Sequence, residues 1–217
     1  MALVDAVMKL LYVDVGRNGR MNDAGIWSQS SMKEAIESGN LRIPGPQALP
    51  HSSRETPSVL VGDEGFGLKT YLMRPYPSRD LHQKKRVFNY RLSRARRIVE
   101  NAFGLPANRW QIFRAPIRHQ PERVIAIVKA AVALHNLLRS KTSTRALYSP
   151  PDSIDAEDVS TRTIRTGTLH QTESVNQALQ KPNNVGCRCS QDAAAVRDTL
   201  KEYFFDEGAV SWQWKFT

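Results

Sequence analysis

Residues 84–103 (KKRVFNYRLSRARRIVENAF) carry the pattern that most restricts the fold, because they can bury one side only as an α-helix. Their apolar residues recur at helical spacing; these are Phe88, Leu92, Ala95, Val99, Ala102 and Phe103. Gly104 and Pro106 are expected to end this helix. A second helix is predicted over 121–140, opened by Pro121 and apolar enough to be buried, and a third over 191–205.

Short strands are predicted between turns in the first 62 residues. Residues 2–15 suggest two strands around a turn near Asp5–Met8, and Val59–Gly62 suggests another. Asn22 or Asp23 can cap a helix that continues to Gly39, and residues 44–58 have the composition of a loop. Strands and helices together indicate an α/β fold.

The chain changes character after residue 148. We predict a domain over 1–148, an irregular or mobile segment over 149–190, and a helix and tail over 191–217 that pack on the domain. Trp212 and Trp214 are expected to hold the tail. Cys187 and Cys189, one residue apart, are interpreted as ordinary thiols.

The charge of the chain favours a polyanionic partner. Lys and Arg number 31 against 21 Asp and Glu, which leaves a net charge of +10. Residues 84–97 hold seven of these cations without an acid, and DNA contact is predicted for Lys84, Lys85, Arg86, Arg91, Arg94 and Arg97. The alternative is a solvated helix face on which Arg96 pairs with Glu100.

Residues 84–86 also suit a nuclear import signal, and no apolar run is long enough to cross a membrane.

Two carboxylates suggest a metal site. Asp63 follows the strand Val59–Gly62, and Glu100 lies beside the apolar face of the basic helix. Mg²⁺ uses one or two carboxylates and completes its shell with water and substrate phosphate. The alternative is that Asp63 simply ends a strand, as acids often do. His135 is interpreted as a core histidine satisfied by hydrogen bonds, with metal ligation as the alternative.

Several motifs resemble the nuclease domain of Harbinger-type transposases and their domesticated relatives, a DDE superfamily endonuclease group. They are LYVDVGRNGRMNDAGIWSQSSM (11–32), VGDEGFGLKTYLMRPYP (61–77), FNYRLSRARRIVENAFG (88–104), NRWQIFRAPI (108–117), AAVALHNLL (130–138) and VRDTLKEYFFDEGAVSWQW (196–214). The resemblance implies an RNase H-like mixed sheet flanked by helices, followed here by an irregular C-terminal segment. It implies three catalytic acids, of which Asp63 matches the second and Glu100 the third, with Mg²⁺ or Mn²⁺ as cofactor. Asp23 matches an acidic position outside this triad and is interpreted first as a helix cap.

The family's first acid lies in an Asp-Gly-Thr-His segment that has no counterpart here. Met1 is therefore expected to begin partway along the second strand, so that the 2–15 hairpin and the Val59–Gly62 strand lack the first strand between them. Three explanations are open: the sequence is a fragment or an incomplete gene model, it is a degenerate copy, or Val59–Gly62 pairs directly with the hairpin in a smaller sheet.

Two functions follow from the resemblance. One is a divalent-metal-dependent DNA endonuclease that hydrolyses phosphodiesters, with catalysis by this chain in question because the first acid is absent. The other is a non-catalytic DNA- or protein-binding remnant of such a transposase. Expected partners are DNA and a Myb-like DNA-binding protein, with no membrane, in the nucleus or also the cytoplasm.

Overall fold

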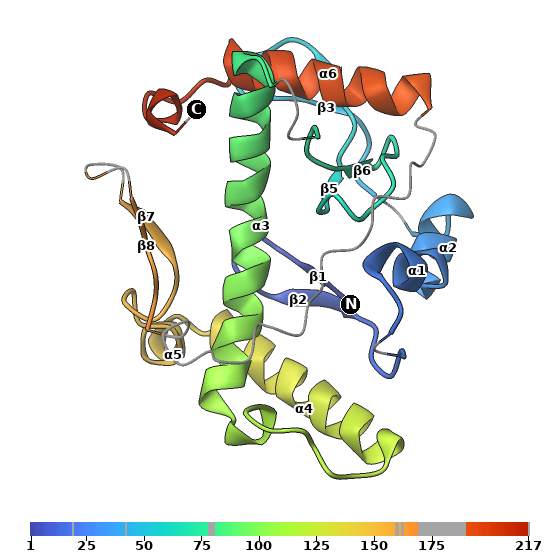
Figure 1. Ribbon diagram of the computed structural model, residues 1–217, viewed down its shortest axis with the longest axis vertical. Coiled ribbons are helices and arrows are strands. Elements are labelled where there is room, and N and C mark those ends of the chain that lie inside the picture. Colours follow the sequence, from blue (N-terminus) through green and yellow to red (C-terminus); the bar gives the residue numbers. More distant parts are fainter. Residues whose placement is uncertain are drawn as a thin grey trace. The chain divides into compact units, whose positions relative to one another are not determined.

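The computed structural model describes residues 1–18, 20–41, 43–77, 81–158, 161, 163–168 and 190–216. The chain divides into two compact units: residues 1–19 with 97–181 form the first unit, and residues 20–96 with 182–217 form the second unit. Helix α3 (Gln83–Arg109) contributes its N-terminal part to the second unit and its C-terminal part to the first (Figure 1). Across the described ranges, no helix combines the length and the hydropathy needed to cross a membrane.

The fold is mixed α/β, as predicted, but the expected RNase H-like mixed sheet is not seen among the described residues. The described strands form two-stranded sheets: β1 (Ala2–Val4) with β2 (Leu10–Val13), β3 (Gln47–Ala48) with β4 (Glu55–Thr56), β5 (Leu60–Val61) with β6 (Leu72–Met73), and β7 (Ala156–Asp158) with β8 (Thr163–Arg165). Only the β5–β6 pair among them is parallel. β5 pairs with β6. Its pairing with the N-terminal hairpin, which belongs to the other unit, stays a prediction.

The first unit begins with the predicted hairpin β1–β2. Its turn is held by Asp5, whose Oδ1 accepts hydrogen bonds from the backbone N–H groups of Val7 (2.9 Å) and Lys9 (2.8 Å). Asn136, on helix α4 (Pro121–Ser140), exchanges two 2.9 Å hydrogen bonds with the backbone of Leu10 and so ties the hairpin to that helix. The expected two strands and turn over residues 2–15 are confirmed.

Helix α3 does not end where Gly104 and Pro106 predict, but continues to Arg109. Proline removes one backbone donor from a helix interior and normally breaks or kinks it. Here the backbone N–H of Trp110 still donates to the carbonyl of Pro106 (2.9 Å), and Leu105 is only 1% exposed. Burial of this turn in the core of the first unit therefore outweighs the local preference. That core comprises Met8, Ala102, Leu105 and Tyr148.

Helix α4 has the predicted bounds and begins at Pro121, but the expectation that it is buried is wrong. Its buried residues are Ala131, His135 and Arg139, whereas Leu134 and Leu137 are 48% and 51% exposed. The helix packs through one side, and its other apolar side faces solvent. Helix α5 (Thr142–Tyr148) follows it in the same unit (Figure 1).

In the second unit, the single helix expected before Gly39 is divided into α1 (Asp23–Ser28) and α2 (Ser31–Glu37). Ser30 causes the break, because its side chain caps α2 by accepting a hydrogen bond from the N–H of Lys33 (3.1 Å). Asn22 caps α1 through the N–H of Gly25 (2.8 Å). Asp23 is thus the first residue of the helix and not its cap.

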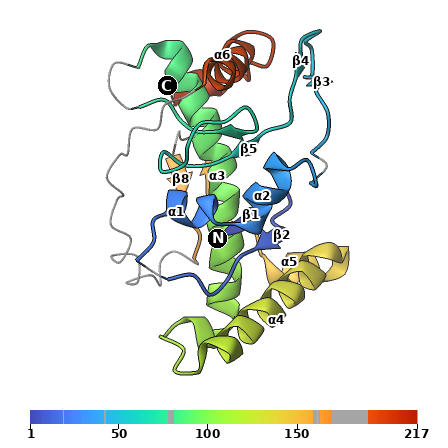
Figure 2. The same ribbon diagram turned by 90° about the vertical axis from the view of Figure 1, so that its right-hand side faces the viewer.

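Helix α6 (Gln191–Phe205) has the predicted bounds and lies across the N-terminal part of α3 (Figure 1). Phe88 of α3 is fully buried between Tyr76 and Phe204, with ring centroids 5.3 and 6.1 Å away. The β3–β4 pair, in the segment expected to be a plain loop, lies beside α6 (Figure 2). The core of the second unit is made by Leu68, Met73, Tyr76, Phe88, Leu92, Ala193 and Leu200.

The C-terminal tail is held in the second unit chiefly by Gln213, which is fully buried. Its side-chain amide donates to the carbonyl of Phe204 (2.9 Å). Trp214 was expected to hold the tail but is 41% exposed, with only an edge contact to Phe205. Trp212 lies under the guanidinium of Arg94, 5.1 Å from the ring centroid, in the expected anchoring role.

The segment expected to be irregular, 149–190, contains the antiparallel hairpin β7–β8 in its described part. Cys187 and Cys189 lie outside the described residues. The domain boundaries at 148 and 190 stay a prediction.

Candidate metal and nucleic-acid site

Asp63 lies two residues after β5, in a tight loop that leads toward β6. Its Oδ1 accepts a hydrogen bond from the N–H of Gly65 (2.8 Å), which folds the chain back after the strand. Arg74, the residue after β6, braces the same loop, since its Nη1 donates to the carbonyl of Phe66 (3.1 Å). Gly62 is required here because a Cβ atom at that position would lie 2.9 Å from the Phe66 ring.

The second oxygen of Asp63 faces Arg96 of α3, with 3.9 Å between Oδ2 and Nη2. Both side chains are about one-third exposed, at 31% and 35%. The two oxygens of the Asp63 carboxylate therefore have different roles. Oδ1 shapes the turn, whereas Oδ2 lies beside the cation Arg96 in a partly exposed side chain and can bind an ion.

Asp23 is electrostatically linked to Asp63 within the second unit. Partial burial of the Asp23 carboxyl and the negative charge of Asp63 raise the pKa of Asp23, and Arg96 opposes them. The residue as a whole is exposed, so solvent limits this shift. Trp27, one turn further along α1, meets Phe66 edge to face at 6.2 Å and fixes α1 against the Asp63 loop. Asp23 is thus a negative group that interacts electrostatically with Asp63. The sequence analysis interpreted it first as a helix cap and matched it to an acidic position outside the triad.

Glu100 is exposed on α3 and belongs to the first unit, whereas Asp63 belongs to the second. Their joint action on one cation therefore stays a prediction. The alternative pairing of Arg96 with Glu100 is not seen, because the recorded ion pair of Arg96 is with Asp63. Within the ranges that the structure describes, no three His, Cys, Asp or Glu side chains gather as a potential metal site.

The basic residues of α3 are mostly engaged with other parts of the protein. Lys84 pairs with Glu202 of α6, and Arg91 lies 4.9 Å from the Phe204 ring centroid while donating to Gln213 (3.3 Å). Arg94 covers Trp212, Lys85 lies over the Tyr76 ring (5.3 Å), and Arg97 pairs with Glu157 (3.8 Å).

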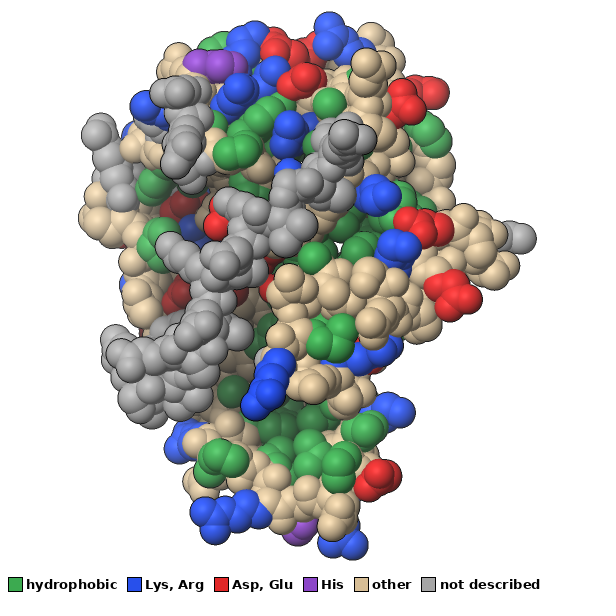
Figure 3. Space-filling view, turned by 45° about the vertical axis from the view of Figure 1, so that its right-hand side comes forward, with side chains coloured by type: hydrophobic (Ala, Val, Ile, Leu, Met, Phe, Trp, Pro, Cys, Tyr) green, Lys and Arg blue, Asp and Glu red, His purple; other side chains and the backbone are tan. Residues whose placement is uncertain are grey.

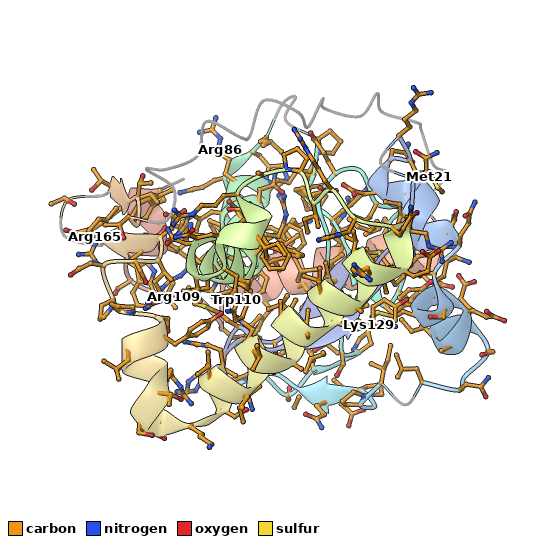
Figure 4. All side chains as sticks on the ribbon, turned by 90° about the horizontal axis from the view of Figure 1, so that it is seen from below. Met21, Arg86, Arg109, Trp110, Lys129 and Arg165 are labelled. Atoms are coloured by element: carbon orange, nitrogen blue, oxygen red, sulfur yellow. The ribbon has the colours of Figure 1, made fainter. Side chains whose placement is uncertain are left out.

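Arg86 differs from this set because it is exposed, with its Nε donating to the carbonyl of Leu81 (3.0 Å). It is labelled in Figure 4. Part of the basic run thus attaches α6 and the tail to α3, a role that the sequence pattern did not predict. No local signal could have indicated it, because the partners lie more than a hundred residues away along the chain.

Residues 1–136 match the family of DDE superfamily endonucleases, which is well over half of the chain. The chain belongs to this family, and the family resemblance seen in the motifs is confirmed. A relative from Arabidopsis thaliana, described as "Protein ALP1-like", is 28% identical over 207 residues. That match covers 93% of this chain but 44% of the relative, so the chain spans less than half of the relative's length. No solved structure matches the chain.

Proposed function

We propose that this chain is the nuclease portion of a divalent-metal-dependent DNA endonuclease of Harbinger transposase descent. The observation that carries the proposal is Asp63, a carboxylate held at a strand end with one oxygen available beside Arg96. Membership of the DDE superfamily endonuclease family supports the same reaction class. The proposed reaction is hydrolysis of a phosphodiester bond in DNA.

Asp63 and Glu100 are the proposed metal ligands. Their carboxylate oxygens suit Mg²⁺ or Mn²⁺, and both side chains are accessible to solvent. A bound ion of this kind would activate water and stabilise negative charge on the phosphate. The turn through Gly65 fixes the direction in which Asp63 presents Oδ2, and Arg96 supplies a positive charge to a phosphate that approaches the same oxygen.

DNA contact is proposed along the basic N-terminal part of α3, with Arg86 as its most accessible cation. The proposed DNA contacts include five further cations, each of which also contacts another part of the protein. These are Lys84, Lys85, Arg91, Arg94 and Arg97. A nuclear location and a Myb-like partner protein are proposed on the family resemblance.

A second candidate function is a non-catalytic remnant that binds DNA or protein. The Asp63–Arg96 ion pair favours it, because a cation bound at Asp63 must compete with the guanidinium already there. This function retains the basic surface and needs no hydrolysis.

Metal binding and DNA nicking by matched variants test the proposal. Asp63→Asn preserves an oxygen for the Gly65 hydrogen bond but removes the charge, and Glu64→Gln alters the neighbouring exposed acid as the control. Wild type and Glu64→Gln should bind Mn²⁺ and nick plasmid DNA, whereas Asp63→Asn and Glu100→Gln should lose both. Equal nicking by wild type and Asp63→Asn would show the metal-site assignment to be wrong. DNA binding without nicking by the wild type would favour the remnant.

A further inference from the structure

The first unit contains an apolar cavity that the proposed nuclease function does not use. It lies between β2, the C-terminal part of α3, the 3₁₀ turn η1 (Gln111–Phe113) and α4, and has a volume of about 320 Å³. This volume falls at the lower end of the range of about 300–1,000 Å³ for ligand sites. Its lining is Leu10, Val13, Ala102, Phe103, Pro106, Ala107, Phe113, Val128, Ala131 and Val132, all of them apolar.

Two of the lining residues are buried in the packing of the unit. Leu10, 6% exposed, is fixed through its backbone by Asn136, and Ala131 is 9% exposed on the packed side of α4. Phe103, in contrast, is 50% exposed although it lines the cavity. A half-exposed aromatic ring beside a preformed apolar hollow is the arrangement that accepts an anchoring side chain from a partner.

Most of the cavity lining comes from a stretch of the chain that is rich in cations. Residues 101–150 contain eight Lys and Arg but a single acid, Glu122. Arg118, Arg123 and Lys129 are exposed, and the structure records no side-chain hydrogen bond or ion pair for these three described residues. Lys129 directly follows the cavity residue Val128, and the other two line an open depression at the start of α4. Figure 3 shows hydrophobic side chains gathered toward the lower end of the molecule with Lys and Arg around them, and Figure 4 labels Lys129 on α4.

We propose that this cavity binds a short acidic segment of a partner protein. One aromatic or branched aliphatic side chain of the segment enters between Phe103 and α4, and its flanking carboxylates face Arg118, Arg123 and Lys129. The basic residues favour a partner with acidic side chains, and the apolar lining favours an apolar side chain in the cavity itself. A nucleic-acid base fits this lining poorly, because its polar edges would be buried without hydrogen-bond partners.

Selection from a displayed peptide library on the full chain tests the proposal. Enriched peptides should contain one Trp, Phe, Leu or Ile flanked by Asp or Glu, and fluorescence anisotropy with the best labelled peptide then measures affinity. Ala107→Leu, which extends a side chain into the cavity, should weaken binding about tenfold or more. Lys129→Glu should weaken it about fivefold and reduce its salt dependence.

Two control variants separate this site from the rest of the surface. Leu134→Ala removes an exposed side chain from the solvent-facing side of α4, and Lys141→Glu reverses an exposed charge just beyond that helix. Both should leave peptide affinity unchanged, and circular dichroism should show all four variants folded. Enrichment of peptides without acidic residues, or equal affinity of Ala107→Leu and wild type, would overturn the proposal. So would loss of duplex-DNA binding in Ala107→Leu, since the cavity would then belong to the DNA surface.

Discussion

The hydroxyl of Tyr148 donates a hydrogen bond to Nδ1 of His135 across 2.9 Å in the core of the first unit. The direction follows from the other ring nitrogen, because Nε2 faces the carbonyl oxygen of Met8 at 2.6 Å and must carry the proton. His135 is fully buried, and both of its nitrogens are satisfied. The prediction of a core histidine is confirmed, and the imidazole joins α4, α5 and the N-terminal hairpin.

Tyr148→Phe should destabilise the protein, because it leaves the Nδ1 acceptor of His135 buried without a donor. The expected loss is ~1–3 kcal/mol in the free energy of unfolding, measured by urea denaturation. His119→Gln, at an exposed histidine, is the control and should have no measurable effect. Equal stability of Tyr148→Phe and wild type would show that the hydrogen bond contributes little.

The stability of the protein should fall as the pH is lowered from about 6.5 toward 5. Burial lowers the pKa of His135, and the nearby Arg139 acts in the same direction against the Met8 hydrogen bond. The unfolded chain therefore takes up a proton at a higher pH than the folded chain does, so the contribution of His135 is complete above the unfolded pKa and is lost on acidification. Urea midpoints at several pH values should show this slope in wild type and a flatter one in His135→Gln. An identical slope in both would assign the effect to other groups.

Long helices with clear terminal signals could be predicted from the sequence. Helix α4 starts at Pro121, and α6 follows Ser190, whose side chain caps it through the N–H of Ala193 (3.2 Å). Helix ends were predicted wrongly where burial or capping opposes the local sequence pattern. Helix α3 continues beyond Gly104 and Pro106 because Leu105 is buried. Ser30 divides a continuous helical pattern because its hydroxyl can replace a backbone acceptor.

The candidate site could be predicted only in part, for a similar reason. A strand that ends in Gly62 and Asp63 is a local signal, and the structure does display that carboxylate after β5. Its partner Arg96 lies on a helix far along the chain, and pairing at that separation depends on tertiary packing. The number of Lys and Arg residues in α3 also suggested a larger free basic surface than the structure has, because Lys84 contacts α6 and Arg91 contacts the tail.

Gln213→Ala should release the C-terminal tail, although its neighbour Trp214 is the larger residue. Gln213 is fully buried, donates to Phe204, and accepts hydrogen bonds from Arg91 and from the N–H of Val210, both at 3.3 Å. Its removal leaves these groups unsatisfied, at an expected cost of ~1–3 kcal/mol. Thermal unfolding and limited proteolysis of the tail measure the effect. Trp214→Ala, at a 41% exposed side chain, is the control and should cost less; the reverse order would contradict this account of how the tail is held.

Arg96→Gln should strengthen cation binding at Asp63 if this carboxylate is a metal ligand. The guanidinium lies 3.9 Å from Oδ2, and both side chains are about one-third exposed at 35% and 31%, so the pair contributes little to stability and acts mainly as a competitor for the ion. Removing a partly exposed charge of this kind corresponds to ~0.2–1 kcal/mol, or about a 1.4- to 5-fold gain in Mn²⁺ affinity. Isothermal titration of Mn²⁺ into wild type, Arg96→Gln and the double variant Arg96→Gln with Asp63→Asn measures it. The gain should vanish in the double variant, because the ligand itself is then neutral. A gain that persists without the Asp63 charge would place the ion elsewhere, and an unchanged affinity in the single variant would mean that Arg96 and the ion do not compete.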